Sequence, residues 1–186
     1  CVYLAFVGVA FMVIYPYLKR ITYFPQLFLG LAFSWSIPMA FAAQTNHVPF
    51  IALLLFIVAT LWPLIYDTLY AMADREEDLK IGVKSTAIWL GEKDRFAVAI
   101  LQVVWLLLLA SLDLVLQLGL WYNVSLLIAF GFFSYQQFLI KELENTFNDI
   151  SDVKTLLSDE ITKNNRLQKA ISNKHIINQL NTELDI

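Results

Sequence analysis

The sequence predicts an all-α membrane protein, a polytopic bundle of transmembrane helices followed by a soluble helical C-terminal tail. Composition is the first reason: the 186 residues are 59% hydrophobic and only 16% charged, whereas soluble domains are about 25% charged. The second reason is where the charges lie. Asp67 is the sole Asp, Glu, Lys or Arg in residues 21–73, and Asp113 is the sole one in residues 96–140. From residue 141 onward the sequence is rich in Lys, Glu, Asp and Asn.

Five apolar stretches are each long enough to cross a bilayer, since a spanning helix needs about 20 mostly apolar residues. They cover about residues 1–18, 23–43, 48–70, 96–118 and 122–140. Their prolines are compatible with membrane helices, because neighbouring helices can satisfy the backbone groups that proline frees. The alternative, a soluble all-α core, conflicts with the absence of a charged face on these runs. We therefore divide the chain into a membrane-embedded portion, residues 1–140, and a soluble amphipathic helical tail, residues 141–186.

Lysine and arginine set the expected orientation, because short cytoplasmic loops carry them in excess. They follow the first, third and fifth stretches, whereas the connections at residues 44–47 and 119–123 contain none. Under strict alternation all basic loops fall on one side of the membrane. Residues 71–95 are therefore predicted to face the cytoplasm or the mitochondrial matrix.

Composition also excludes other classes of protein. Cys1 is the sole cysteine, which rules out an intramolecular disulfide and any multi-cysteine metal site. A net charge of −3 without a basic stripe argues against nucleic-acid binding. The chain opens on Cys1 in apolar sequence without the pattern of a signal peptide, so we interpret it as the interior of a longer protein.

Carboxylates follow the third apolar stretch with a helical spacing. If that helix continues, steps of 100° per residue place Asp67, Tyr70, Asp74 and Asp78 on one face. Asp67 lies inside the apolar span, where a carboxylate marks a functional site by default. Carboxylates one turn apart suit Mg²⁺, which takes one or two protein carboxylates together with phosphate oxygens.

Two lysines, Lys80 and Lys84, follow at the same spacing and could offer positive charge to a phosphate. The alternative is a solvated loop whose charges only keep the helix from sliding into lipid. That alternative explains Glu76 and Glu77, but it does not explain Asp67 or the shared helical register.

This region resembles a known family motif. The resemblance is to the second aspartate-rich motif of UbiA-type membrane prenyltransferases, above all the 4-hydroxybenzoate polyprenyltransferases of ubiquinone biosynthesis, and it rests on Tyr66-Asp67-Thr68-x-Tyr70-Ala71-x-x-Asp74-Arg75-x-x-Asp78 with Lys80-Ile81-Gly82-x-Lys84-Ser85-Thr86. Three further stretches agree in order and spacing: Tyr15-Pro16-x-x-Lys19-Arg20-x-Thr22 with Pro25-Gln26, then Gly30-x-x-x-Ser34-Trp35-Ser36-Ile37-Pro38-Met39-Ala40, and Tyr135-Gln136-Gln137-x-Leu139-Ile140.

The resemblance implies a nine-span bundle in a bacterial or mitochondrial inner membrane, of which this chain carries five spans. It implies Mg²⁺-dependent transfer of a polyprenyl group from polyprenyl diphosphate to 4-hydroxybenzoate, on the cytoplasmic or matrix face. By resemblance, Asp74 and Asp78 bind the Mg²⁺–diphosphate and Lys84 contacts the diphosphate. Asp67 and Tyr70 complete the polar wall.

Arg20 matches a family arginine that holds the aromatic carboxylate or the diphosphate, a role that suits its bidentate guanidinium. A positive-inside anchor is an equal alternative for this residue. The family's first motif, Asn-Asp-x-x-Asp-Arg-x-x-Asp, is absent, so the chain alone is expected to be inactive. Prenyl transfer to haem or to a naphthoate, and a non-catalytic membrane scaffold, remain alternative functions.

The tail carries a stripe typical of an amphipathic helix, formed by Leu143, Phe147, Ile150, Leu157, Ile161 and Ile171. Asn164-Asn165 and Ser172-Asn173 are expected to interrupt this helix. Its many acidic residues disfavour a helix lying on the membrane surface, since such helices usually carry a basic face. A coiled-coil segment that binds a partner helix and a sequence foreign to the enzyme remain as alternatives.

Overall fold

The computed structural model describes residues 2–184, which form helices and connecting turns without any strand in that range. The chain divides into two compact units, residues 1–137 and 138–186. Five helical segments are long and apolar enough to cross a membrane, as the sequence predicted. The all-α membrane fold class is thereby confirmed, and the chain is an integral membrane protein.

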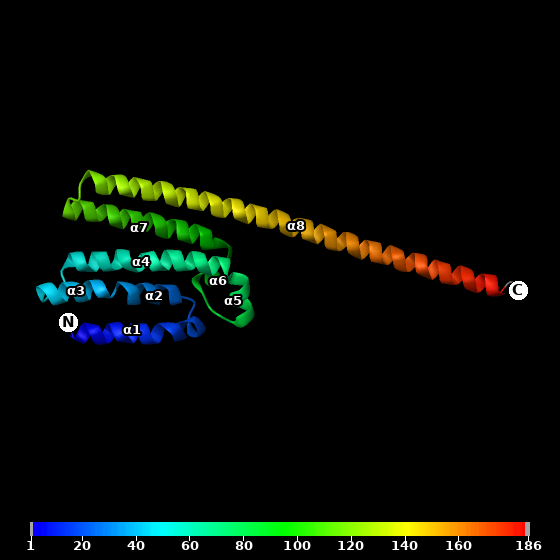
Figure 1. Cartoon of the computed structure of the whole chain (residues 1–186), viewed down its shortest axis with the longest axis horizontal. Helices are drawn as coiled ribbons and strands as arrows, with labels where there is room; N and C mark the ends of the chain where they lie inside the picture. The colour runs from blue at the N-terminus through cyan, green and yellow to red at the C-terminus, as the bar shows by residue number, and fades with distance from the viewer. Residues whose placement is uncertain (1, 185–186) are drawn as a thin grey trace. The chain divides into compact units, whose positions relative to one another are not determined.

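The first unit is a bundle of nearly antiparallel helices (Figure 1). In chain order its elements are α1 (Val2–Ile21), α2 (Pro25–Ser34), α3 (Ser36–Thr45), α4 (Phe50–Ala73), α5 (Arg75–Ile81), α6 (Thr86–Leu90), the 3₁₀ turn η1 (Gly91–Lys93), α7 (Asp94–Leu116) and the start of α8 (Leu120–Leu184). Helix α2 packs against α1 and α4, and α4 packs against α7. The end of α1, the start of α2 and the short helices α5 and α6 gather at one end of this bundle (Figure 1).

The second span is broken at Trp35, where α2 and α3 meet. Pro38 lies just beyond the break, and because it has no N–H it cannot bond the carbonyl of Ser34 as a continuous helix would require. At the break, the indole Nε1–H of Trp35 donates a hydrogen bond to the Leu4 carbonyl of α1, 2.7 Å away. The break therefore fixes an aromatic side chain against the first span.

Helices α2 and α4 approach each other closely at small residues, a common way for membrane helices to associate. Gly30 and Ser34 are buried on the α2 side of this contact. The hydroxyls of Ser34 and Thr60 are hydrogen bonded at 2.6 Å. This contact fixes the position of α2 relative to α4, the helix that carries Asp67.

A glutamine network joins α7 to the part of α8 that belongs to the first unit. The Gln102 amide is buried, and its Nε2 donates to Gln136 Oε1 at 2.7 Å. Its Oε1 accepts from Gln137 Nε2 at 3.0 Å. All three amides thus find partners between two apolar helices, where an unpaired amide would be unfavourable.

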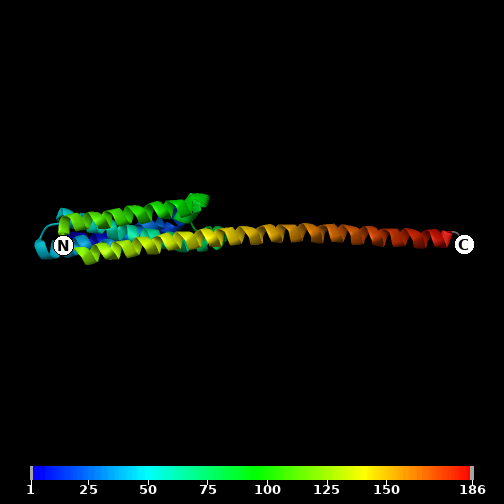
Figure 2. The same cartoon turned by 90° about the horizontal axis from the view of Figure 1, so that it is seen from above.

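The second unit consists of the continuation of α8, which is described as far as Leu184. The expected interruptions at Asn164-Asn165 and Ser172-Asn173 are wrong, because α8 runs through both (Figure 2). The physical reason is that the energetic penalty is small: an ordinary residue such as Asn or Ser disfavours a helix by at most about 0.7 kcal/mol relative to Ala. That is too little to end a helix without a proline or a glycine.

Candidate functional site

A polar pocket of about 70 Å³ lies at the end of the bundle where α5 and α6 are found. It is lined by Lys19, Gln26, Asp67, Tyr70, Ala71, Asp74, Asp78, Val83, Lys84 and Ser85. These residues come from four separate places: the end of α1, the start of α2, the end of α4, and the segment that runs through α5 to α6. Three carboxylates and two ammonium groups therefore share one small pocket.

The helix that carries the carboxylates is interrupted at Asp74. Helix α4 ends at Ala73, and Asp74 has φ −89° and ψ 3° before α5 begins at Arg75. The expectation of one continuous helix is therefore wrong at this residue. The register is nevertheless kept, because the Asp74 N–H donates to the Tyr70 carbonyl at 3.1 Å and the Asp78 N–H donates to the Asp74 carbonyl at 2.9 Å.

Side-chain capping does not account for the interruption, although Asp is a preferred residue at the start of a helix. Asp74 occupies the position before α5, yet its side chain makes no capping hydrogen bond. Its carboxylate oxygens are therefore not used by the backbone of α5. Asp74 and Asp78 lie one helical turn apart and both line the pocket.

Lys84 reaches the pocket from the loop after α5. That helix ends at Ile81 and is followed by Gly82, whose φ of 71° is left-handed, so Lys80 and Lys84 do not share a helix as expected. The Lys84 backbone N–H donates to the Lys19 carbonyl at 2.9 Å, and its Nζ donates to the Ile21 carbonyl at 3.2 Å. The partial negative charge at the C-terminus of α1 thus holds this ammonium group at the pocket.

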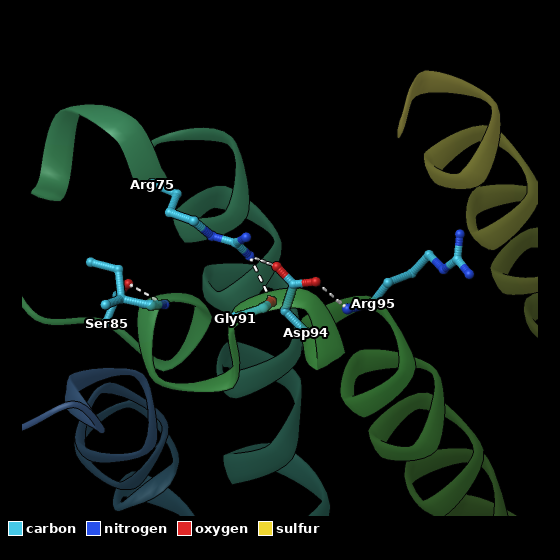
Figure 3. Close-up of polar contacts among 6 residues, drawn as sticks. Arg75, Ser85, Gly91, Asp94 and Arg95 are labelled. Atoms are coloured by element: carbon cyan, nitrogen blue, oxygen red, sulfur yellow. Dashed lines mark hydrogen bonds and ion pairs between the residues drawn. The ribbon is translucent and has the colours of Figure 1, made fainter. Parts of the chain in front are cut away.

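Gln26, which lines the pocket, is held in place by hydrogen bonds with Thr86. Gln26 is 2% exposed, and its Oε1 accepts from the Thr86 N–H at 3.2 Å and from the Thr86 hydroxyl at 2.8 Å. Next to it, the buried Ser85 hydroxyl accepts from the Ile88 N–H at 3.3 Å and caps α6 (Figure 3). The start of α2 and the start of α6 are therefore joined by side-chain hydrogen bonds.

Of the residues proposed from the sequence, the pocket brings together Asp67, Tyr70, Asp74, Asp78 and Lys84. Arg20 and Lys80 are exposed and are not among the residues that line it. Their proposed contacts with substrate stay predictions.

Five lining residues had not been selected from the sequence as site residues, and three of them are polar: Lys19, Gln26 and Ser85. Gln26 had a signal that could have identified it, because a polar side chain in the first turn of an apolar span needs a specific partner. Lys19 follows the first span and lies in a stretch that resembles the family, but no role in the site had been assigned to it. Ser85 lies within the stretch that resembles the family motif, but no role had been assigned to it.

A second, larger pocket of about 420 Å³ lies between α7 and the start of α8. Apolar side chains line it, with Asn123 as the single polar one. It offers neither a carboxylate nor a cation, so the charged chemistry of the polar pocket has no counterpart there.

Comparison with known proteins places the chain in a family. Residues 1–155 match the UbiA prenyltransferase family. The chain is 54% identical over 138 residues to a 4-hydroxybenzoate octaprenyltransferase of Coxiella burnetii, covering 74% of this chain and 48% of the relative. It is 51% identical over 141 residues to one of Vibrio campbellii, covering 76% and 50%, and 52% identical over 138 residues to one of Vibrio atlanticus, covering 74% and 49%.

The chain thus spans about half the length of the curated relatives it matches. No solved structure matches it significantly. The family match covers the whole membrane bundle, including every residue that lines the polar pocket. The chain belongs to the UbiA prenyltransferase family.

Proposed function

We propose that the protein containing this chain transfers a polyprenyl group from its diphosphate to the ring of 4-hydroxybenzoate, a step of ubiquinone biosynthesis. The observation that carries the proposal is the polar pocket, where Asp74, Asp78, Lys19 and Lys84 meet in a family of prenyltransferases. The relatives' names, which specify 4-hydroxybenzoate and an octaprenyl group, support the choice of acceptor. The length of the transferred chain is not part of the proposal.

UbiA-family prenyltransferases generally use a divalent metal, and the residues of this pocket fit Mg²⁺. Among the residues whose side chains the structure describes, no group of three or more His, Cys, Asp or Glu could by itself hold a metal ion. Mg²⁺ sites in enzymes that act on phosphates need fewer protein ligands, because substrate oxygens and waters complete the coordination. Asp74 and Asp78 would hold the ion, which supplies positive charge to the departing diphosphate.

The two lysines of the pocket have a complementary role. Departure of an allylic diphosphate leaves a cation stabilised by resonance and a leaving group whose negative charge increases. Lys19 and Lys84 approach the pocket from α1 and from the loop after α5, and we assign them to stabilise this charge. Fixed positive groups aimed at a developing anion are among the strongest contributions to catalysis.

Asp67 and Tyr70 form the wall of the pocket on the α4 side. Asp67 is half-buried and lies about two turns before Asp74, nearer the apolar part of the span. We assign these two residues to the acceptor side, where polar groups orient a phenol and the surrounding apolar helices keep water from the cation.

Orientation completes the proposal. Lys19, Arg75, Lys84 and Lys93 all lie at the end of the bundle where α5 and α6 are found. Because short basic loops stay on the cytoplasmic side, we propose that the polar pocket opens toward the cytoplasm or the mitochondrial matrix.

A chimera tests the function with the rest of the enzyme present. The aligned 138-residue segment replaces its counterpart in the Coxiella burnetii relative, and membranes are assayed for transfer of labelled polyprenyl diphosphate to 4-hydroxybenzoate. We expect Mg²⁺-dependent product from the chimera. Asp74→Asn or Asp78→Asn should lower turnover by about 10²- to 10³-fold, the usual effect of removing one charge-stabilising group.

Matched controls come from the same short helix. Glu76 and Glu77 are exposed residues of α5 that do not line the pocket, so Glu76→Gln and Glu77→Gln should retain most of the activity. Equal effects of all four substitutions, or normal turnover by both aspartate variants in folded protein, would contradict the assignment of the pocket.

A further inference from the structure

A buried ion pair lies directly beside the aspartate-bearing break between α4 and α5. Asp94, the first residue of α7, is 4% exposed and forms an ion pair with Arg75, the first residue of α5. The same Arg75 nitrogen, Nη2, donates to the Gly91 carbonyl at 3.1 Å (Figure 3). One guanidinium therefore joins the start of α5 to the turn between α6 and α7.

The partners of Asp94 explain why it can be buried. One carboxylate oxygen binds Arg75, and the other accepts from the Arg95 backbone N–H at 2.5 Å. The N-terminus of α7 adds favourable partial positive charge. A carboxylate that loses such a partner is left buried and unpaired, which is strongly destabilising locally. The position of Arg75 is thus linked to the position of α7.

Arg75 lies between Asp74 and Asp78 in the chain, but it does not line the pocket. Its guanidinium is engaged with Asp94 and Gly91. Helix α5 has 7 residues and buries none of its side chains, so its direction depends on the backbone hydrogen bonds across Asp74 and on attachments to neighbouring elements. Arg75 adds a side-chain attachment between α5 and the turn before α7 to these backbone hydrogen bonds.

We propose that Arg75 is a positioning residue, and that its attachment to Asp94 and Gly91 sets the direction of α5 and so holds Asp74 and Asp78 at the pocket. This inference rests on the proposed function for its consequence, metal–diphosphate binding, but not for its geometry. Arg75 acts through the two aspartates and touches neither the metal nor the substrate.

The first measurement is geometric and independent of chemistry. In the chimera described above, with its other cysteines replaced by serine, Glu77→Cys and Glu92→Cys carry spin labels on the two elements that Arg75 joins. The distance distribution between the labels should broaden or shift in Arg75→Ala and in Asp94→Asn. Lys93→Ala removes a positive charge beside Asp94 from an exposed side chain and should leave the distribution unchanged.

The second measurement is binding of Mn²⁺ in the presence of inorganic pyrophosphate, followed by electron paramagnetic resonance without spin labels. Arg75→Ala should weaken binding at least tenfold, which corresponds to about 1.4 kcal/mol. Arg75→Lys should restore most of the affinity, because one nitrogen makes both contacts. In the described part of the chain, Arg75 Nε is buried without a hydrogen-bond partner, so a lysine loses little by lacking it.

The outcomes separate the two proposals. Unchanged distances in Arg75→Ala and Asp94→Asn would overturn the positioning role, as would equal affinity in Arg75→Ala and the parent chimera. If the parent itself fails to bind Mn²⁺ with pyrophosphate, the proposed function is wrong while the distances still decide the role of Arg75. Should Arg75→Ala not accumulate as folded protein, Arg75→Gln takes its place in both measurements.

Discussion

A test of helix packing uses three glycines that differ in what surrounds them. A Cβ built on Gly30 would lie 2.2 Å from the Thr60 carbonyl oxygen, a backbone atom. A Cβ on Gly8 would lie 2.9 Å from Cδ1 of the Trp35 side chain. A Cβ on Gly131, in the first unit's part of α8, meets nothing within 4 Å. We therefore expect Gly30→Ala to destabilise the bundle most and Gly131→Ala least.

The magnitude follows from the size of the clash. Real Cβ atoms essentially never approach another atom closer than 3.0 Å, so Gly30→Ala must separate α2 from α4 by about 0.8 Å. That movement strains the 2.6 Å hydrogen bond between Ser34 and Thr60. Overpacking of this kind typically destabilises a protein by about 1–3 kcal/mol.

Gly131→Ala provides the matched control, because it changes helix propensity without causing a clash. Replacing a glycine by alanine within a helix stabilises that helix by up to about 1 kcal/mol. Gly30→Ala has the same gain, so the difference between the two variants isolates the clash. Gly8→Ala should fall between them, since a tryptophan side chain can move but here donates to the Leu4 carbonyl. The free energy of unfolding, measured by denaturant titration of the purified chimera, should rank the variants in this order. Equal stability of Gly30→Ala and Gly131→Ala would refute the close approach of α2 and α4.

Two further predictions concern the bundle. Gln102→Leu should lower the free energy of unfolding by about 1–3 kcal/mol, because it leaves Gln136 and Gln137 without their partner. Interhelical hydrogen bonds in membranes contribute about 0.6–2 kcal/mol each. An unchanged unfolding curve would contradict this prediction. Gln44 and Glu92 are both exposed. In a cysteine-free chimera, Gln44→Cys and Glu92→Cys should react with an impermeant maleimide from opposite sides of the membrane, with Glu92→Cys accessible from the cytoplasm. Labelling of both from one side would exclude the proposed orientation.

The sequence was sufficient to predict the helices because the bilayer imposes a simple requirement on them. Each span needs a run of apolar residues, and such runs are visible without knowledge of any contact. The carboxylate spacing was likewise visible, since hydrogen bonds across Asp74 keep a helical register. Local spacing within one helix is a property that the sequence carries directly.

Details that depend on distant residues were not predictable in the same way. The break at Trp35 reflects Pro38 together with a partner on α1, and the lysine after Gly82 is placed by the end of α1. The interruption at Asp74 lies beside the anchor that Arg75 forms on α7. In the tail, polar residue pairs were expected to break a helix that is in fact continuous. The weak helix preference of Asn and Ser is not enough to end a helix.

The hydrogen bonds between the start of α2 and the start of α6 have a consequence for the order in which the protein is made. Thr86 is separated from Gln26 by 60 residues of sequence, so it leaves the ribosome long after the first two spans. Until then the Gln26 amide lacks its buried partner, and the loop that carries Lys84 cannot bond the end of α1. A nascent chain arrested just before Lys84 already holds Lys19 and all three aspartates, but it lacks Lys84 and Ser85, which also line the pocket. The polar pocket can therefore be completed only late in synthesis, after the segment from Lys84 to Thr86 has been made.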